Sequence, residues 1–437
     1  MSFQQGLSGL NASSKNLDVI GNNIANSNTY GYKTSRAEFA DVYAGALSGA
    51  GSNPVGIGTQ LQTVAQQFSQ GNITTTENSM DLAINGNGFF EVTDGLNPTM
   101  YTRNGQFKLD KDGFIVNNGG LKLLGYPANG QGVIQPGLAK PLQLPTAGID
   151  PAVTTKVNME FNLDSRAAVT ASDVNPGSID LNDPTTYNNA TSMTVYDAKG
   201  QEVAVTMYYQ KNADNDDGST TWNIFATANG KPFATDAYGD DIGVDDNGNP
   251  TSPYATITFP AEGGKPIDPS AAVNMDIPAG TNSVGASTLP ITGIQFNMTS
   301  ATENGSSFGV TNLTQDGYAP GQLTSISIDD SGIILARYSN GQSKPAGQVE
   351  LANFRNVQGL APQGGNVWAR TFASGDPIVG VPGDGNLGAL KSGALEDTNV
   401  DLTGELVNMV TAQRIYQANA QTIKTQDQIL QTIVNLR

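Results

Sequence analysis

Two stretches near opposite ends of the chain share one spacing of apolar residues, in which steps of four and three residues alternate. The first stretch consists of Phe3, Leu7, Leu10, Ser14, Leu17, Gly21 and Ile24. The second consists of Leu402, Leu406, Met409, Gln413, Tyr416, Ala420, Ile423, Asp427, Leu430 and Val434. A repeat of about 3.5 residues forms the seam of a coiled coil. The chain therefore predicts two terminal helices that meet in a common base.

The same spacing also fits an ordinary amphipathic helix pair inside one domain, but two features favour assembly of several copies. The C-terminal stretch carries a second apolar stripe, and a helix that is apolar on more than one face needs more than one neighbour. That stripe comprises Ile415, Ala418, Thr422, Ile429, Ile433 and Leu436. The seams also contain small or polar residues, such as Ser14, Gly21 and Asp427, which weaken an isolated helix pair.

We therefore expect further copies of the chain to complete the helices. The expected subunit-interface residues are Phe3, Leu7, Leu10, Leu17, Ile24, Leu402, Leu406, Met409, Tyr416, Ala420, Ile423, Leu430 and Val434.

The composition excludes several classes of function. The 437-residue chain carries a formal net charge of −18 and contains neither Cys nor His. Such an acidic chain is a poor partner for nucleic acid, because phosphate binding requires clustered Lys and Arg, and an acidic membrane surface repels it as well. The missing side chains exclude disulfides, Ser-His and Cys-His catalytic pairs and the usual zinc sites. Carboxylate chemistry remains, but no carboxylate pair lies in a recognisable aromatic cleft pattern. We expect no enzyme, no catalytic residues, no cofactor and no metal.

Two patterns resemble ligand sites and are better explained as turns. Gly86-Asn87-Gly88 follows an expected strand, but neither a helix pattern nor a Walker lysine follows it, which favours a hairpin turn over a phosphate loop. The acidic clusters at 214–218 and 240–248 lack the ligand spacing of a calcium loop, so we interpret them as solvated turns.

Turn dipeptides divide the middle of the chain into short strands. Between Tyr101 and Tyr126, turns at Asn104-Gly105, Asp112-Gly113 and Asn118-Gly119-Gly120 predict tight hairpins, because these residues adopt positive φ at little cost. Similar turns predict hairpins that join 193–196 to 203–209 and 323–328 to 333–338.

Changes of composition divide the chain into nested parts. The stretch from Gly45 to Gly58 is rich in Gly, Ser and Ala and predicts a linker, and a Pro-rich crossing between Pro136 and Pro151 marks a boundary. The expected parts are a terminal helical core (1–24 and 399–437), a connecting region (25–71 and 391–398), an inner β-domain (72–145 and 318–390) and an inserted outer β-domain (146–317). The expected fold class is multidomain α+β, with a coiled-coil-like base of terminal helices and nested all-β domains between them.

The chain lacks an apolar run of about 18 residues, so no transmembrane helix is expected. Its first six residues, Met1-Ser2-Phe3-Gln4-Gln5-Gly6, lack the basic and apolar regions of a cleaved secretory signal. Taken alone, these features predict a cytoplasmic protein, or one exported by a route without such a signal.

Several segments resemble the bacterial flagellar axial protein family of the rod and hook. The opening residues 1–26 and Gly31-Tyr32-Lys33 are similar to the N-terminus of that family. Later similar blocks are Leu82-Ala83-Ile84, Gly88-Phe89-Phe90, 101–107, 393–402, Glu405-Leu406-Val407, Ala412-Gln413-Arg414 and 416–419. Asn353-Phe354, Gly359-Leu360, Asn366-Val367-Trp368 and the large inserted domain resemble hook members; a distal rod protein, shorter in the middle, is the alternative.

The resemblance implies a self-assembling tube that links the rod of the rotary motor to the filament, bends as a universal joint and transmits torque. It implies homopolymerisation, and rod, hook-cap and hook–filament junction proteins as further partners. It also implies export by the flagellar type III apparatus without a cleaved signal peptide, and an extracellular location in the flagellum without membrane insertion. A secreted β-rich adhesin or carbohydrate-binding protein is an alternative of another class, which explains Asn/Thr-rich strands but not the matched seams.

Overall fold

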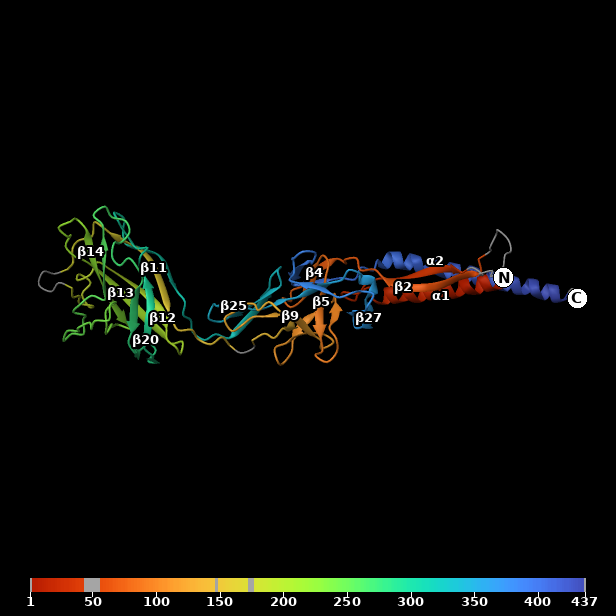
Figure 1. Ribbon diagram of the computed structural model, residues 1–437, viewed down its shortest axis with the longest axis horizontal. Helices are drawn as coiled ribbons and strands as arrows, with labels where there is room; N and C mark the ends of the chain where they lie inside the picture. Colours follow the sequence, from red (N-terminus) through yellow and green to blue (C-terminus); the bar gives the residue numbers. More distant parts are fainter. Residues whose placement is uncertain (1, 43–55, 146–147, 172–176, 436–437) are drawn as a thin grey trace. The chain divides into compact units, whose positions relative to one another are not determined.

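The computed structural model describes residues 2–42, 56–145, 148–171 and 177–435, and the chain forms two compact units (Figure 1). The first, here called the base unit, consists of Met1–Thr146, Thr324–Arg337 and Ser343–Arg437. The second, the inserted unit, consists of Ala147–Leu323 and Tyr338–Gln342. The mostly β structure with two terminal helices confirms the expected fold class. The finer division into four nested parts stays a prediction.

Both long helices belong to the base unit: α1 is Ser2–Ala25 and α2 is Leu402–Asn435. The end of α1 falls in the Asn-rich run, as predicted, and the N–H of Asn26 bonds the carbonyls of Asn22 and Asn23 at 3.1 and 3.2 Å. At the start of α2, Oδ1 of Asp401 accepts the N–H of Thr403 at 3.0 Å, which satisfies one of the free donors of the first turn. A short 3₁₀ turn, η1 (Val357–Gly359), adds to the described helices.

A strand pair follows α1 in the region expected to be a connection. Strand β1 (Ser35–Val42) pairs antiparallel with β2 (Gly58–Gln66), from Ser35 opposite Gln66 to Val42 opposite Gly58. The connecting region 25–71 therefore contains regular structure. The sequence of β2 includes Thr and Val, which favour strands. Most of the predicted 45–58 linker lies outside the described residues.

The remaining strands of the base unit form a β-body. They are β3 Ile73–Thr75, β4 Leu82–Asn85, β5 Phe89–Thr93, β6 Met100–Thr102, β7 Phe107–Leu109, β8 Ile115–Asn117, β9 Lys122–Pro127, β10 Lys140–Pro141, β23 Leu323–Ile328, β24 Ile333–Tyr338, β25 Ser343–Val349, β26 Leu351–Asn353, β27 Ala361–Gly364, β28 Val367–Ala369, β29 Ile378–Gly380, β30 Ala389–Ser392 and β31 Ala394–Glu396. Thirteen of them share one sheet, whose main path runs β23-β24-β25-β9-β5-β6-β28-β27.

Local turn chemistry accounts for several of these pairings. The predicted hairpin of 323–328 with 333–338 is confirmed as β23 and β24, and Asp329 closes its turn by accepting the N–H of Ile333 at 2.8 Å. β7 also pairs with β8 across the predicted turn at Asp112-Gly113.

The turn Gly86-Asn87-Gly88 joins β4 to β5, but it is not a hairpin. β4 pairs with β30, whereas β5 pairs with β6, β9 and β26, so the predicted hairpin was wrong. The local sequence encodes the change of direction, while the partner of β4 lies some 300 positions further along the chain, at Ala389–Ser392.

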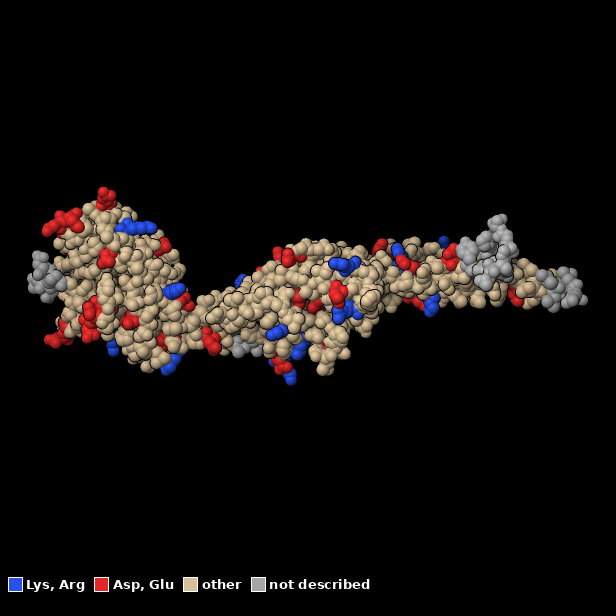
Figure 2. Space-filling view, in the orientation of Figure 1, with Lys and Arg blue, Asp and Glu red and all other residues tan. Residues whose placement is uncertain are grey.

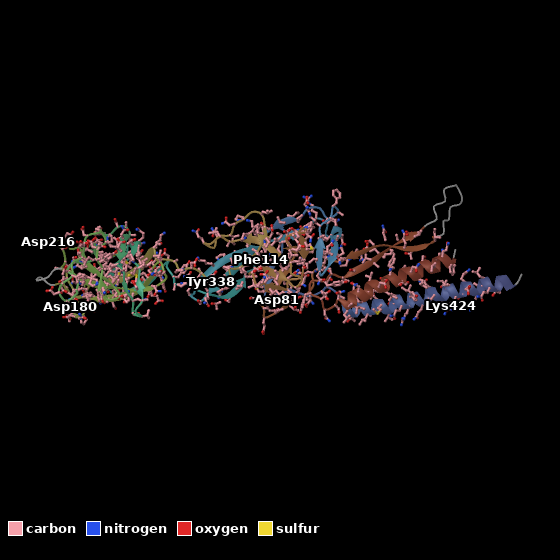
Figure 3. All side chains as sticks on the ribbon, turned by 90° about the horizontal axis from the view of Figure 1, so that it is seen from below. Asp81, Phe114, Asp180, Asp216, Tyr338 and Lys424 are labelled. Atoms are coloured by element: carbon pink, nitrogen blue, oxygen red, sulfur yellow. The ribbon has the colours of Figure 1, made fainter. Side chains whose placement is uncertain are left out.

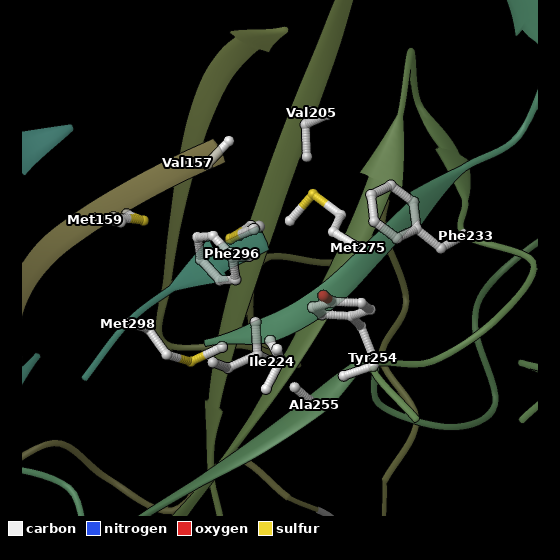
Figure 4. Close-up of a cluster of buried hydrophobic side chains, with 14 of the residues drawn as sticks. Val157, Met159, Val205, Ile224, Phe233, Tyr254, Ala255, Met275, Phe296 and Met298 are labelled. Carbon is white, nitrogen blue, oxygen red and sulfur yellow. The ribbon is translucent and has the colours of Figure 1, made fainter. Parts of the chain in front are cut away.

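The inserted unit contains two five-stranded sheets and a small hairpin. Its strands are β11 Lys156–Asp164, β12 Asn189–Tyr196, β13 Glu202–Lys211, β14 Thr220–Ala228, β15 Lys231–Pro232, β16 Ala255–Phe259, β17 Val273–Ile277, β18 Gly280–Thr281, β19 Ser287–Thr288, β20 Ile291–Asn297, β21 Thr302–Asn304 and β22 Gly309–Gln315. Alternate residues of β11 are buried, as one face of a strand requires. Val157 of β11, Phe296 of β20 and Ile224 of β14 join one apolar core (Figure 4).

The two segments that enter and leave the inserted unit lie side by side. Ile149 and Gly321 form an isolated antiparallel bridge, with N–H···O distances of 2.8 and 3.2 Å. Further in, the predicted hairpin of 193–196 with 203–209 is confirmed as β12 and β13, with Val195 opposite Val203. Its turn is held by Asp197, whose Oδ1 accepts the N–H groups of Lys199 and Gln201 at 2.8 Å each.

Candidate subunit interface

The two helices of the base unit pack antiparallel, and small residues of α1 allow a close approach. A Cβ added to Gly6 would lie 3.1 Å from Cγ1 of Ile423, and one added to Gly9 would lie 2.9 Å from Nδ2 of Asn419. Near the other end of α1, Nδ2 of Asn23 donates to Oε1 of Glu405 at 3.3 Å. Increasing numbers on α1 therefore match decreasing numbers on α2.

The buried stripe of α1 is offset from the predicted seam. The most buried positions include Gly6, Ser13 and Ile20, each one residue before the predicted Leu7, Ser14 and Gly21. One residue turns a helix by about 100°, so the predicted apolar stripe lies on the flank of the helix contact and not at its centre. The apolar side chains of the seam are therefore only partly used inside a single chain.

The structure places the expected interface residues at the surface of the base unit. Phe3, Leu7, Leu402, Leu406, Tyr416 and Leu430 are exposed. Leu10, Leu17, Ile24, Met409, Ala420 and Ile423 are half-buried. The side chain of Val434 lies outside the described residues. In the second stripe Ile415, Ala418, Thr422 and Ile429 are exposed, while Ile433 and Leu436 also lie outside the described side chains.

Two further apolar residues of α2 were missed by the seam pattern. Val407 is 61 % exposed and Val410 is 49 % exposed, and they lie three positions apart, so a search for i, i+3 pairs outside the main seam would have found them. Together with Leu406 and Ile415 they give α2 large apolar side chains on several faces. Such a helix surface is typical of a segment that other chains cover.

The last turns of α2 extend beyond α1. Because Gly6 faces Ile423, the start of α1 at Ser2 lies beside approximately residue 427 of α2, and residues 428–435 have no α1 segment beside them. This overhang is about 12 Å long at 1.5 Å per residue. Figure 1 shows the C-terminal end of α2 beyond the N-terminus, and Figure 3 shows Lys424 shortly before the overhang begins. The exposed Ile429 and Leu430 belong to the overhang.

The β1–β2 pair is hydrogen-bonded along α1. Oγ of Ser8 accepts the N–H of Thr59 at 3.3 Å, and Nε2 of Gln5 donates to the carbonyl of Gly56 at 2.6 Å. Toward the other end of α1, the buried Asn23 amide pairs with both backbone groups of Ser35, at 2.8 and 2.9 Å. The strand pair and the helices therefore form one assembled element.

A buried ion network connects this helical element to the β-body. Lys33 follows α1, Arg103 follows β6, and Glu396 ends β31. The Lys33 ammonium lies 2.7 Å from one oxygen of Glu396, and the Arg103 guanidinium lies 3.1 Å from the other. Lys33 and Glu396 are fully buried and Arg103 is nearly so.

Backbone groups satisfy much of the remaining hydrogen-bonding capacity of this network. Lys33 Nζ donates to the carbonyl of Ser69 at 2.8 Å, Arg103 Nη2 donates to the carbonyl of Gly86 at 2.7 Å, and Glu396 accepts the N–H of Gly71 at 2.9 Å. Burial lowers the pKa of Lys33, the Glu396 carboxylate opposes that change, and the nearby Arg103 adds to it. The three charges fix segments from distant parts of the sequence in one arrangement.

The segments that carried the family resemblance meet at this network. Gly31 donates its N–H to the carbonyl of Glu396 at 2.9 Å, and it has a φ of +70°. A Cβ at Gly31 would lie 2.6 Å from the backbone N of Asn104, so only glycine fits there. The carbonyl of Asp81, labelled in Figure 3, accepts the N–H of Gly393 at 2.8 Å. Blocks 31–33, 101–107 and 393–402 therefore converge.

Among the described residues outside this network, the charged side chains form no cluster of potential metal ligands. On the face shown in Figure 2, Lys and Arg are scattered among uncharged residues. Across the described ranges, no three carboxylates come together as potential metal ligands. In the acidic clusters, Asp217 and Asp245 hold turns by accepting the N–H groups of Ser219 and Asn249 at 2.9 and 2.7 Å. Judged by length and hydropathy, none of the described helices qualifies as a bilayer-spanning segment.

Comparison with known proteins identifies the family. Models of flagellar proteins match four segments: basal body rod protein over 3–33, hook protein FlgE/F/G D1 domain over 83–201, basal body protein FlaE D2 domain over 162–318, and basal body rod FlgEFG C-terminal domain over 391–436. The flagellar hook protein FlgE of Salmonella typhimurium (strain LT2) is 41% identical over 439 residues, which covers 100% of both chains. The chain belongs to the flagellar hook protein family.

Other members of the hook protein family align over the same full length. FlgE of Escherichia coli (strain K12) is 40% identical, covering 100% of both chains. FlgE of Borreliella burgdorferi is 33% identical over 459 residues, covering 100% of this chain and 99% of that protein. The crystal structure of Helicobacter pylori hook protein FlgE2 is 15% identical with a TM-score of 0.49, covering 74% of this chain and 100% of that one.

Proposed function

We propose that the chain is the structural subunit of the bacterial flagellar hook, and that its copies assemble through their terminal helices into a tube. The apolar surface of α2 is the observation that carries the proposal. Leu402, Leu406, Val407, Val410 and Ile415 are each 45 % or more exposed in the single chain. Burying one such side chain contributes roughly 1.5–3 kcal/mol, so covering several of them with neighbouring copies supplies the driving force for assembly.

The register of the helices supports an open, repeating assembly. Residues 428–435 have no α1 segment of the same chain beside them, and we propose that a different part of another copy covers them. A contact between two different surfaces leaves the complementary surface free on each new subunit, and repetition of such a contact builds a helical array. The expected interface residues at Leu10, Met409 and Ile423 remain part of this proposal.

A hook subunit has to pass torque from the rod to the filament while the tube bends. The ion network of Lys33, Arg103 and Glu396 supports the first requirement, because it ties the helical element to the β-body by short buried contacts. Bending then requires sliding between β-strands of neighbouring copies. We further propose that the rod, hook-cap and hook–filament junction proteins are partners, and that the flagellar type III apparatus exports the chain without a cleaved signal.

The alternatives receive less support. The full-length identity with hook proteins favours a hook subunit over a distal rod protein. The exposed apolar residues of α2 favour self-assembly over a monomeric adhesin or carbohydrate-binding protein. A structural role without catalysis agrees with relatives that are named as hook proteins.

Substitutions in the overhang test the proposal. Replacing Ile429 and Leu430 with Ala removes two exposed apolar side chains that do not lie beside α1. We expect the variant to fold normally by circular dichroism but to form no tubes, by electron microscopy, at concentrations where the unmodified chain does. Replacing Gln428 and Gln431 with Ala is the matched control on the same turns, and it should assemble. Normal assembly of the Ile429/Leu430 variant would contradict a role of the overhang, and a chain that forms no tubes under any condition would contradict the hook function itself.

A further inference from the structure

Two buried carboxylates come together where β5 meets the start of β26 in the β-body. Glu91 is in the middle of β5, and the ladder between β5 and β26 places Leu351 opposite Phe90 and Ala352 opposite Phe89. Glu350 directly precedes β26, next to the pair of Leu351 with Phe90, and both Glu91 and Glu350 line one hollow. Glu91 is 6 % exposed and Glu350 is 2 % exposed. Like charges that are buried close together are destabilising, so this pair calls for a compensating group.

The described part of the chain does not supply that compensation. Glu350 accepts a hydrogen bond from the hydroxyl of Tyr126 at 2.8 Å, whereas Glu91 has neither a hydrogen-bond partner nor an ion-pair partner among the described residues. Arg370 lines the same hollow, but its guanidinium pairs with the exposed carboxylate of Asp376 and forms no ion pair with Glu91. The side chain of Glu91 is largely buried and its carboxylate opens into a hollow, and an unpaired carboxylate in such a place indicates a function or an absent ligand.

The carboxylates border a hollow with an apolar rim. Its volume is about 430 Å³, and its polar lining consists of Glu91, Glu350, Tyr101, Thr99 and Arg370. Leu138 and Val379 line its rim and are 88 % and 48 % exposed. A polar end lined by acids and an apolar entrance fit a positively charged group on an alkyl stem.

We propose that this hollow receives the ammonium group of a lysine from a second copy of the chain. An ammonium has three donors and can bond both carboxylates, whereas a guanidinium is best matched by a single carboxylate. Ca²⁺ would need six or more oxygen ligands and Mg²⁺ six, which these two carboxylates do not provide. The inference rests on the proposed assembly of identical copies, which brings the β-body of one copy next to another.

The pKa values of Glu91 and Glu350 agree with two carboxylates that have no ion-pair partner among the described residues of the single chain. Burial, and then the neighbouring Glu350, raise the pKa of Glu91 to about 7. Burial also raises the pKa of Glu350, which the bond from Tyr126 opposes. The other titratable and charged groups around Glu91 are Tyr101, Tyr126, Arg370 and Asp376. An entering ammonium would favour the ionised form of Glu91 and lower its pKa.

Assembly assays with Glu91→Gln test the proposal. At pH 8 the critical concentration for tube formation should be at least tenfold higher for the variant than for the unmodified chain. At pH 6, where Glu91 is protonated in the single chain, the two critical concentrations should be similar. Asp112→Asn is the control, because it removes one exposed charge from the same unit, and it should assemble like the unmodified chain. Carbodiimide treatment of unmodified tubes should join Glu91 to a lysine of another copy, as mass spectrometry would show. Equal critical concentrations for Glu91→Gln and the unmodified chain, or no such cross-link, would overturn the inference.

Measurements on dilute full-length chains separate this inference from the proposed function. The carboxyl ¹³C signal of Glu91 should titrate at a pKa at least one unit lower in the presence of n-butylammonium, and Mg²⁺ at equal charge concentration should have no effect. If Mg²⁺ alone lowers the pKa, or if neither ion does, the lysine site is wrong. Failure of both the unmodified chain and Asp112→Asn to form tubes would instead disprove the hook function.

Discussion

The ammonium of Lys33 lies 2.7 Å from the carboxylate of Glu396, although both side chains are fully buried and 363 positions separate the two residues. Arg103 contacts the second oxygen of the same carboxylate, so one anion serves as the counter-charge for two cations and the network keeps one net positive charge. The arrangement joins the end of α1 to β6 and β31, and it makes Glu396 the central residue of the connection between helices and β-body.

Removing the central charge should therefore cost more than removing one of its partners. Glu396→Gln leaves two buried cations without a counter-charge, and we expect it to lower the free energy of unfolding of the base unit by about 3–5 kcal/mol. Lys33→Met should cost less, because Arg103 still neutralises Glu396. Urea unfolding measures both changes. Glu38→Gln, which breaks the exposed pair with Arg36, is the control and should change stability by less than about 1 kcal/mol. An equal cost for the Glu396 and Lys33 variants would show that the network is not organised around Glu396.

A pair of glycine substitutions separates backbone strain from steric exclusion. Gly31 and Gly95 both have positive φ, +70° and +82°. A Cβ at Gly31 meets Asn104 at 2.6 Å, whereas a Cβ at Gly95 meets nothing within 4 Å. We expect Gly95→Ala to cost about 1 kcal/mol and Gly31→Ala at least about 3 kcal/mol, measured by thermal unfolding. Similar costs for the two variants would mean that the approach of 31–33 to 101–107 is looser than the structure indicates.

Substitution of Leu406 should distinguish assembly from folding. Leu406 is 47 % exposed in the single chain, so Leu406→Ala should leave the thermal unfolding of dilute chains nearly unchanged. If neighbouring copies bury it as proposed, the substitution should remove roughly 1.5–3 kcal/mol from assembly, and the critical concentration should rise about tenfold or more. Sedimentation of polymer measures that concentration. Leu96→Ala, at a loop residue that is 93 % exposed, is the control. A large loss of chain stability in Leu406→Ala would contradict its assignment to the subunit interface.

The stability of the single chain should fall as the pH rises toward neutrality. The folded pKa of Glu91 is about 7, above its ordinary value of 4.5, so the folded state holds an extra proton between these values. The contribution of this proton to the free energy of unfolding is complete below pH 4.5 and is lost as the pH rises through 7. The free energy of unfolding should fall by about 3 kcal/mol over this range. Urea unfolding of the Glu91→Gln variant should lack this pH dependence. A parallel dependence in the variant and the unmodified chain would assign the effect to another group.

Local patterns predicted those parts of the fold that local chemistry determines. The end of α1 follows from Asn22 and Asn23, which provide turn-forming side chains, and the β23–β24 hairpin follows from the Asp329 turn. The hairpin proposed at Gly86-Asn87-Gly88 was wrong because its geometry depends on β30, a strand that arrives from far along the chain. Turn residues specify a change of direction, but long-range pairing is decided by packing.

The apolar spacing predicted the two terminal helices but not which of their faces meet, and the subunit interface itself stays a prediction. The 3-4 spacing located Leu7 and Leu406 on helices, yet Gly6 and Ser13 occupy the centre of the helix contact. Apolar periodicity assigns large side chains to a buried face, and it does not reveal that small residues permit the closest approach of two backbones. The buried ion pair of Lys33 and Glu396 could not be predicted from the neighbouring sequence, because each residue alone has the sequence context of an ordinary surface residue.

The bridge between Ile149 and Gly321 has a consequence for how such chains can diverge. Because the strands that lead into and out of the inserted unit are already paired, its size can change while the distance between entry and exit stays constant. A fluorescent protein or an epitope inserted into the unit between Ile149 and Gly321 should thus label the polymer without altering the terminal helices that are proposed to assemble it.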